Sequence, residues 1–569
     1  MSRSGVVTID EVLADLKARF GDKIVDIKKL TPNQLEIVTT RDAAPDMALY
    51  LIRKYRDCEA HLSNHVATDE REINGHFGVS YWISINAGKG DLWIAVKTYL
   101  PPDDPKIKSI TPEYPGANWY EREARDVIGI EPEGHPDPRK LVVPDDLPEG
   151  VYPLRRDYPH YAKHITEPKY EFKEPEKYEV IVPFGPYHVS LDEPAHFRLY
   201  VEGEEIVDVD YRGFYSYRGI EKLAESRLTV KQVPFIAERI CGICGFTHST
   251  AYCQAVEAAA EIEVPERAEY IRTIMLEIER LHSHLLWIGI ACHLVGFDTG
   301  FMHAWRIRER VMWLAERLTG NRKTYGMNVV GGVRRDILEY RRKMVLDTLR
   351  ELKAEYKSLV DMVLSTRTFV KRCEGVGVLP YDKACAYGTV GPLARGSGRK
   401  IDTRKDHPYA AYKYVDFKVP VYTEGDVLAR AMVRIEEVWE SIWIIEQALD
   451  KLPGGPIVAE VRDIPPYREA VGYTEAPRGE NVHYVMTGPG NRVYRYRARA
   501  ATFNNLPAAP EMLKGYTVAD APLIVASIDP CYSCTERVIV VNVKSGEKRV
   551  LTQSELVRLS RKKSMRLGL

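Results

Sequence analysis

Two Cys-x-x-Cys pairs are the residues of this chain best suited to chemistry. The first pair is Cys241 and Cys244, and the second, near the C-terminus, is Cys531 and Cys534. Four soft, polarizable thiolates brought together by the fold would form a sulfur-only metal site. Zinc ribbons join their pairs across roughly 15–20 residues, whereas residues 245–530 intervene here. We therefore favour a redox-metal site between remote elements over structural zinc, a thioredoxin-like pair or buried structural thiols.

Composition is that of a globular protein with several domains. The chain has 569 residues, of which 45% are apolar and 28% are charged, and these fractions are ordinary. A formal net charge of −1 gives no indication of binding to nucleic acid or to an anionic membrane surface. There is neither a long apolar run of transmembrane type nor an apolar signal core at the N-terminus. We expect a cytoplasmic protein that is attached to a membrane only through partners.

An α+β docking domain with an extended arm is predicted for residues 1–165. An amphipathic helix ends near Phe20 and precedes strand-like runs at 34–39, 81–86 and 91–99, several of which alternate apolar and polar residues. Residues 111–160 are rich in proline, glycine and aromatic residues, which indicates a short helix followed by the arm.

A charged linker at 166–179 leads to a mainly α-helical domain over residues 180–537. That domain begins with a small β-sheet on its N-terminal side and becomes helical from about residue 265, where apolar residues recur at helical spacing. Long helices are expected at 303–318, 335–368 and 425–452. Residues 538–569 follow as a C-terminal extension.

The frames of both cysteine pairs resemble the two signature motifs of the [NiFe] hydrogenase large subunit. They read Arg239-Ile-Cys-Gly-Ile-Cys-Gly-Phe-Thr-His248 and Asp529-Pro-Cys-Tyr-Ser-Cys-Thr-Glu-Arg537. Segments 296–302, 332–336 and 475–480 resemble the energy-converting, membrane-associated branch of formate hydrogenlyase type. Asn118-Trp-Tyr-Glu-Arg-Glu and Gly134-His-Pro-Asp are similar to the 30 kDa subunit of respiratory complex I. The resemblance thus implies a fusion of 30 kDa-like and 49 kDa-like modules.

The resemblance also implies a cofactor and a reaction. Cys241 and Cys531 would be terminal nickel ligands, while Cys244 and Cys534 would bridge nickel to an iron that carries carbonyl and cyanide. The reaction would be the reversible reduction of protons to dihydrogen. Because no iron–sulfur motif is left over, electrons would come from a [4Fe–4S] cluster in a partner small subunit. Other hydrophilic and membrane subunits would complete a complex I-like assembly at the inner face of the cell membrane. Formate dehydrogenase is our first candidate donor, and ferredoxin or carbon monoxide dehydrogenase remain open.

Glu193 and Arg478 match functional positions of the family, and Asp529 and His248 are candidates by their places beside the cysteine pairs. Glu193 matches its proton-gate glutamate, with Asp192 as a neighbouring competitor and a loop carboxylate as the plainer interpretation. Arg478 matches the arginine above the metals, where its fixed fork can act near the centre, unless it is a structural ion-pair partner. Asp529 would orient Arg478. His248 would share a helix face with Cys244 and hydrogen-bond a thiolate, although a core histidine is an equal alternative.

Other features define the competing interpretations. His188 lies where the complex I relative carries a quinone-site histidine, so a quinone-site subunit or a structural zinc protein without hydrogenase activity is the alternative. His282 and His284 point to different faces of a helix, so we interpret them as core polar groups.

In the family, an endopeptidase removes the C-terminal extension, which predicts cleavage after Arg537; a permanent strand and helix is the alternative.

Overall fold

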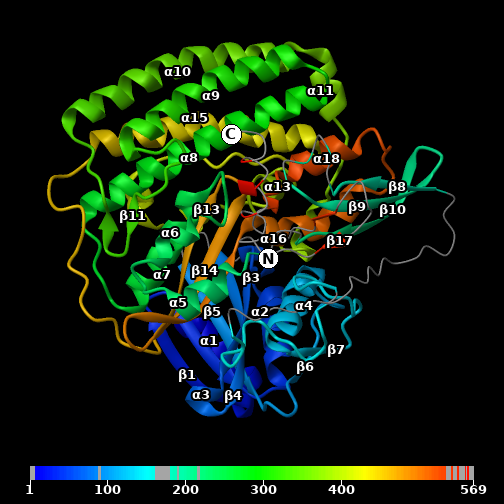
Figure 1. The fold of residues 1–569 in the computed structure, drawn as a ribbon, viewed down its shortest axis with the longest axis vertical. Coiled ribbons are helices and arrows are strands. Elements are labelled where there is room, and N and C mark those ends of the chain that lie inside the picture. Colours follow the sequence, from blue (N-terminus) through cyan, green and yellow to red (C-terminus); the bar gives the residue numbers. More distant parts are fainter. Residues whose placement is uncertain are drawn as a thin grey trace.

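The structure is a computed structural model that describes most of the chain (Figure 1). The described residues are 7–86, 91–145, 147–159, 180–186, 188, 191, 193–214, 218–532, 540–541, 548–549, 558, 561–562 and 565. Asp192, Cys534, Arg537 and the predicted linker 166–179 lie outside them.

The N-terminal part is a five-stranded sheet of order β1-β2-β5-β4-β3, in which only β2 and β5 run parallel. Its strands are β1 (Ile24–Thr31), β2 (Gln34–Thr39), β3 (His61–Glu70), β4 (His76–Asn86) and β5 (Asp91–Leu100). Helix α1 (Ile9–Phe20) begins with a capping box in which Thr8 and Glu11 satisfy each other's backbone N–H groups. Helices α2 (Ala43–Lys54) and α3 (Arg71–Asn74) complete this part. The predicted first helix and strands are confirmed, and β4 begins five residues earlier than expected.

The predicted short helix lies between the N-terminal sheet and the second part of the chain. It is α4 (Asn118–Ile128), with β6 (Lys106–Lys108) before it and β7 (Glu131–Glu133) after it. Helix α4 is buried on most sides, and its Glu123 forms an ion pair with Arg497 of the second part. This helix therefore packs between the two parts.

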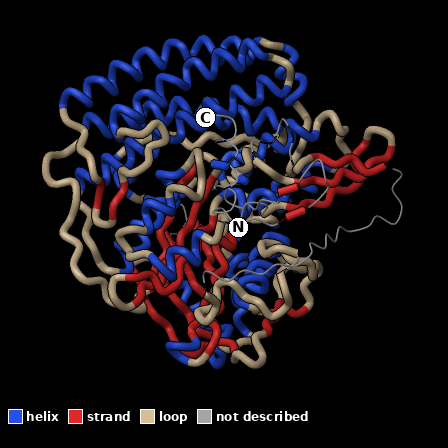
Figure 2. Tube along the Cα trace, viewed as in Figure 1, coloured by secondary structure: helices blue, strands red, loops and turns tan. Residues whose placement is uncertain are grey.

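Four long helices form one layer of the second part, at the top of Figures 1 and 2. They are α8 (Glu266–Leu294), α9 (Asp298–Thr319), α10 (Glu339–Ser365) and α15 (Val427–Asp450), and they confirm the expected helical stretches. Helix α8 lies between α9 and α15 and buries nearly its whole circumference. That position lets side chains of α8 reach the centre of the molecule.

Shorter elements surround this layer. A three-stranded sheet projects to the side, built from β8 (Val180–Phe184), β9 (His196–Glu202) and β10 (Glu205–Arg212). Helices α5 (Ile220–Arg227), α6 (Val233–Ala237) and α7 (Gly245–Ala259) lead into α8. The remaining short elements are β11 (Asn328–Val329), β12 (Gly332–Val333), α11 (Arg367–Cys373), α12 (Tyr381–Ala386), α13 (Gly391–Arg395), α14 (Thr403–Asp406), α16 (Ala501–Asn505), α17 (Ala509–Leu513), α18 (Ala521–Ile528), β16 (Val540–Val541) and β17 (Lys548–Arg549).

A second three-stranded sheet was not predicted from the sequence. It consists of β13 (Glu469–Ala476), β14 (Gly479–Gly488) and β15 (Arg492–Arg499). These strands are buried on both faces, with β14 buried at every position, so the alternation that marks a half-exposed strand is missing. The sheet packs on α7 and reaches β3 of the N-terminal sheet, which places it at the centre of the molecule.

The two parts of the chain are joined by polar contacts that are buried. The Gln34 amide donates to the Val471 carbonyl at 2.8 Å and accepts from the Val471 N–H at 2.9 Å. Nearby, Lys97 Nζ lies 3.0 Å from Glu70 and 2.9 Å from Glu469 of β13. Burial alone would lower the pKa of Lys97, but the surrounding carboxylates raise it well above its usual range. Lys97 therefore neutralises carboxylates from both parts.

Replacing Lys97 with methionine is expected to destabilise the chain by about 3–5 kcal/mol, because buried carboxylates would lose their counter-charge. The control is Lys108→Met, since Lys108 and its partner Asp46, 2.8 Å away, are both exposed; this exposed pair should contribute less than about 1 kcal/mol. Thermal and urea denaturation of the two variants would measure the difference. Equal, small effects would show that the Lys97 cluster does not hold the two parts together.

Within the described residues, no helix is both long and apolar enough to cross a membrane.

Candidate metal centre

Cysteines from both ends of the second part meet in one buried cluster. Cys241, Cys244 and Cys531 are 0%, 3% and 4% exposed and contact one another beside Ala476. The Sγ atoms of Cys241 and Cys531 lie 3.0 Å apart, well beyond the roughly 2.05 Å of a disulfide bond. The structure thus brings together three of the four predicted ligands, and Cys534 lies outside the described residues.

The first pair sits in the turn that connects α6 to α7. The backbone N–H groups of Ile243 and Cys244 both donate to Cys241 Sγ, at 3.3 and 3.2 Å. Cys244 is the residue immediately before the first turn of α7. Backbone N–H donors and a helix N-terminus both favour the negative charge of a thiolate.

The helix that follows is anchored by Glu279 of α8. The Glu279 carboxylate accepts from the N–H groups of Phe246 and Thr247, at 2.8 and 2.9 Å, in the first turn of α7. Burial raises the pKa of Glu279 to about 7. Tyr325 also donates to the Cys241 carbonyl, at 2.9 Å. The first pair is therefore fixed by contacts from two later segments.

The second pair follows α18 directly. Asp529 ends this helix in the left-handed region, at φ 58° and ψ 53°, which aspartate tolerates better than most residues. The chain then turns through Pro530, and the Cys531 N–H donates to the Thr502 hydroxyl at 3.0 Å. The left-handed residue therefore ends the helix just where the chain must turn toward the first pair.

Arg478 occupies the tip of the tight hairpin that joins β13 to β14, where Ala476 pairs with Gly479. Its guanidinium donates to the Asp529 carbonyl and carboxylate, both at 2.7 Å, and to the Ser283 hydroxyl at 3.1 Å. Gly391 packs against this tip so closely that a Cβ there would lie 2.3 Å from the Arg478 carbonyl oxygen. The hairpin, α8 and α18 thus fix the guanidinium from three sides.

The charges of the cluster fit a bound cation. Burial alone would lower the pKa of Arg478, but Asp529 and the three site sulfurs raise it above its usual range. A hydrogen bond with Cys241, burial and the neighbouring sulfurs raise the pKa of Cys244 well above its usual range. A metal ion would replace the thiol protons and offset the thiolate charges. Because the ligands are sulfur, the donor set fits a soft or borderline metal such as nickel or iron.

The histidines named from the sequence make contacts with different groups. His248 lies in the first turns of α7, and its backbone N–H reaches the Cys244 carbonyl at 3.3 Å. His282 contacts the Ile243 carbonyl at 2.9 Å, whereas His284 contacts Glu437 at 2.7 Å. The prediction that His282 and His284 serve as separate core polar groups is confirmed.

Glu193 lies half-buried between β8 and β9, and remains a candidate by its position in the sequence. His188 packs its ring 4.5 Å from that of Phe184.

Sequence reasoning missed Ser283, which contacts Arg478, and Glu279, which anchors α7. Neither residue belongs to the apolar series of α8 that recurs at helical spacing, so the sequence carries no signal for their burial or for the groups that they meet.

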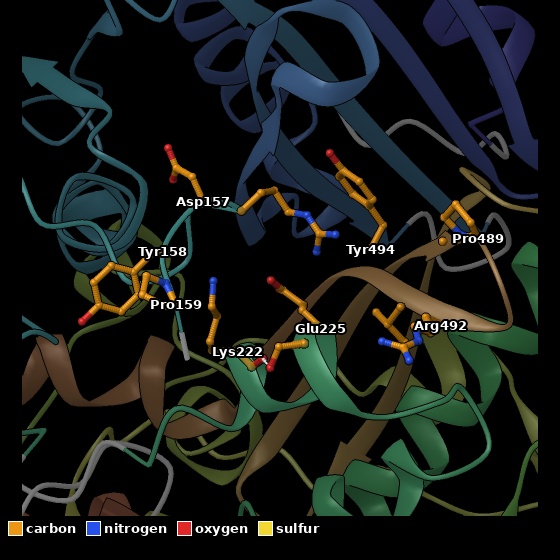
Figure 3. Close-up of a pocket in the computed structure, with 12 residues that line it drawn as sticks. Asp157, Tyr158, Pro159, Lys222, Glu225, Pro489, Arg492 and Tyr494 are labelled. Atoms are coloured by element: carbon orange, nitrogen blue, oxygen red, sulfur yellow. Dashed lines mark hydrogen bonds between the residues drawn. The ribbon is translucent and has the colours of Figure 1, made fainter. Parts of the chain in front are cut away.

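A separate hollow lies between the arm, α5 and the turn that joins β14 to β15 (Figure 3). Its volume is about 290 Å³. Lys222 and Glu225 rise from α5 toward the arm residues Asp157 and Tyr158, and Tyr494 closes another side. Its charged lining is Arg156, Lys222 and Arg492 with Asp157 and Glu225. This lining differs from that of the sulfur cluster, so we assign the hollow no role in the metal centre.

Comparison with known proteins identifies the family. The model for nickel-dependent hydrogenases matches residues 218–298. Those for the 49 Kd and 30 Kd subunits of the respiratory-chain NADH dehydrogenase match 295–472 with 462–537, and 37–164. Formate hydrogenlyase subunit 5 of Escherichia coli (strain K12) is 45% identical over 554 residues, which cover 96% of this chain and 97% of that protein. The chain belongs to the formate hydrogenlyase type of [NiFe] hydrogenase large subunits. The predicted family, the fused two-module fold and the oxidoreductase class are confirmed.

Two further relatives are named as parts of membrane-bound assemblies. The membrane-bound hydrogenase subunit alpha of Pyrococcus furiosus is 42% identical over 409 residues, 69% of this chain and 95% of that protein. A solved subunit of the membrane-bound sulfane sulfur reductase, an archaeal respiratory membrane complex, is 34% identical with a TM-score of 0.60. It covers 63% of this chain and 98% of its own. Because that complex is named for another reaction, the activity must be argued from the residues of the site.

Proposed function

We propose that this hydrogenase is a catalytic large subunit that reversibly reduces protons to dihydrogen at a nickel–iron centre. The observation that carries the proposal is the buried cluster of Cys241, Cys244 and Cys531 beneath Arg478. Cys534 would complete the ligand set. Two unrelated features of the chain, its membership of the family and the convergence of these sulfurs, support the same site.

Each residue of the site has a distinct role in the proposal. Cys241, Cys244, Cys531 and Cys534 would hold the nickel and the iron through their thiolates. When bound, the centre with its carbonyl and cyanide ligands would supply the cleavage and formation of dihydrogen. Arg478 holds a fixed positive charge and hydrogen-bond donors beside the sulfurs, in a position to bind a cyanide. Asp529 keeps that guanidinium in place through two hydrogen bonds.

Metal analysis of the purified protein tests this proposal. We expect nickel and iron in equal amounts. Zinc alone would support the structural alternative, and a metal-free protein would support a quinone-site subunit instead.

Glu193 is proposed to pass protons between the centre and solvent. We expect Glu193→Gln to slow hydrogen evolution by about 10²-fold, because the amide cannot release or accept a proton in this step. Nickel content should be unchanged. The control is Glu202→Gln, at the exposed end of β9, which should keep the wild-type rate. Full activity of Glu193→Gln would remove this residue from the proton route.

Partners supply the functions that this chain does not carry. We propose that a small subunit with a [4Fe–4S] cluster delivers electrons, and that formate dehydrogenase is the electron source. Residues 1–165 would dock on other hydrophilic subunits, joined by the linker 166–179 to the catalytic domain 180–537. Membrane subunits would hold the complex at the inner face of the cell membrane.

The extension 538–569 is proposed to be removed after Arg537 by a maturation endopeptidase once nickel is inserted. The extension does not hold Cys531 away from the first pair, because Cys531 Sγ lies 3.0 Å from Cys241 Sγ in the chain that still carries residues 538–569. Mass spectrometry of active protein should find a chain that ends at Arg537.

A further inference from the structure

A row of three buried side chains leads away from the sulfur cluster. Nδ1 of His248 lies 2.9 Å from Nε2 of His483 on β14, and Nδ1 of His483 lies 2.9 Å from the Tyr496 hydroxyl on β15. The exposed fractions of the three residues are 1%, 0% and 0%. His483 and Tyr496 belong to the central sheet that the sequence did not predict, so neither had been assigned a role.

The central histidine of this row is neutral, because burial lowers the pKa of His483 well below its usual range. A neutral imidazole carries one N–H donor and one bare acceptor nitrogen. The two hydrogen bonds of the row must therefore point in the same direction, either from Tyr496 toward His248 or the reverse.

The Tyr496 hydroxyl decides between these directions. If Tyr496 donates to His483, then His483 donates from Nε2 to Nδ1 of His248. The proton left over is then the one on Nε2 of His248, which is not among the buried polar atoms that lack a partner in the described residues. In the reverse direction the Tyr496 proton would need another acceptor, and the described residues offer this hydroxyl only His483 as a hydrogen-bond partner. A buried donor without an acceptor is costly, so the first direction is favoured.

We propose that Tyr496 and His483 are positioning residues that hold His248 as the Nε2–H tautomer, ready to donate to a cysteine thiolate of the metal centre. His248 lies one helical turn beyond Cys244. An N–H donor stabilises a thiolate, whereas a bare nitrogen would repel it. The identity of the acceptor rests on the proposed function; the direction of the row does not.

Nitrogen-15 NMR of the full chain, labelled at histidine and prepared without nickel, measures the tautomer directly. His248→Gln identifies the signal. We expect His248 to be protonated at Nε2 in the wild-type protein. A proton on Nδ1 would overturn the proposal even if no variant folds, and it would leave the proposed metal centre untouched.

Tyr496→Phe removes the donor that sets the direction, so His248 should then populate both tautomers. The matched control is Tyr252→Phe. Tyr252 is equally buried, packs edge-on against Tyr496 at 5.3 Å and donates to the Val230 carbonyl instead. It should leave His248 unchanged. A single Nε2–H form in Tyr496→Phe would contradict the positioning role.

In metal-loaded protein, the infrared bands of the iron ligands should shift in Tyr496→Phe and not in Tyr252→Phe. Unmoved bands in both variants would show that the row does not act on the centre. If the purified protein contains neither nickel nor iron, the proposed function is overturned, but the tautomer result still stands.

Discussion

Cys531→Ser is expected to abolish both hydrogen evolution and nickel retention. Cys531 is buried and lies 3.0 Å from Cys241 between their Sγ atoms. Serine is nearly the same size, so packing is preserved. Its hydroxyl, however, is a hard and weakly acidic group that replaces a soft thiolate poorly as a ligand of nickel. The loss should therefore appear in metal content as well as in rate.

The matched control is Cys253→Ser. Cys253 is a fully buried thiol on α7, the helix that follows the first pair, but it is not part of the sulfur cluster. Nickel content and hydrogen evolution per folded molecule should remain at the wild-type level. Wild-type nickel in Cys531→Ser would refute the ligand assignment, and loss of nickel in both variants would indicate a general folding defect.

Arg478→Lys is expected to lower hydrogen evolution by about 10²–10³-fold while nickel and iron are retained. Lysine keeps the positive charge, but it cannot reproduce the planar fork that now binds Asp529 twice and Ser283 once. Removing one preorganised donor from a buried reaction centre typically costs this factor. The rate should be measured on protein with full metal content.

A suitable control for Arg478→Lys is Arg272→Lys. Arg272 is also buried and makes a two-point contact with Glu257, at 2.9 and 2.7 Å, remote in its contacts from the sulfurs. This variant should lose stability but keep its activity per folded molecule. Equal activity losses in the two variants would mean that Arg478 acts only through folding.

The two cysteine motifs predicted the site because the reactive residues of each motif stand close together in the sequence. Cys241 and Cys531 stand in short motifs whose residue types and spacing are visible without a fold. Helices such as α8 and α15 were also predictable, since their apolar residues recur at helical spacing over long stretches. The N-terminal strands followed from the alternation of apolar and polar residues in several of their runs, although the fold buries β2, β4 and β5 on both faces.

The central sheet could not be predicted in the same way. Strands β13 to β15 are buried on both faces and carry arginine, histidine and glutamate inside the molecule. Those polar residues are satisfied by partners far along the chain, such as Glu221 and Glu225 for Arg495. A pattern built on apolar inside and polar outside has no signal for such strands.

The same limit applies to the contacts around Arg478. Its place in a turn was visible from the sequence, but the hydroxyl of Ser283 and the close approach of Gly391 depend on how α8 and α13 pack. His483 and Tyr496 are further examples, because their roles follow from a row of hydrogen bonds across three elements. Spacing along the chain identifies candidate groups, and only the fold shows which of them meet.

The most direct test of the account is infrared absorption of the purified protein. A nickel–iron centre held by these cysteines predicts bands of carbonyl and cyanide bound to iron, present in the wild-type protein and absent from Cys531→Ser. A wild-type protein that shows none of these bands and contains zinc as its metal would contradict the central claim.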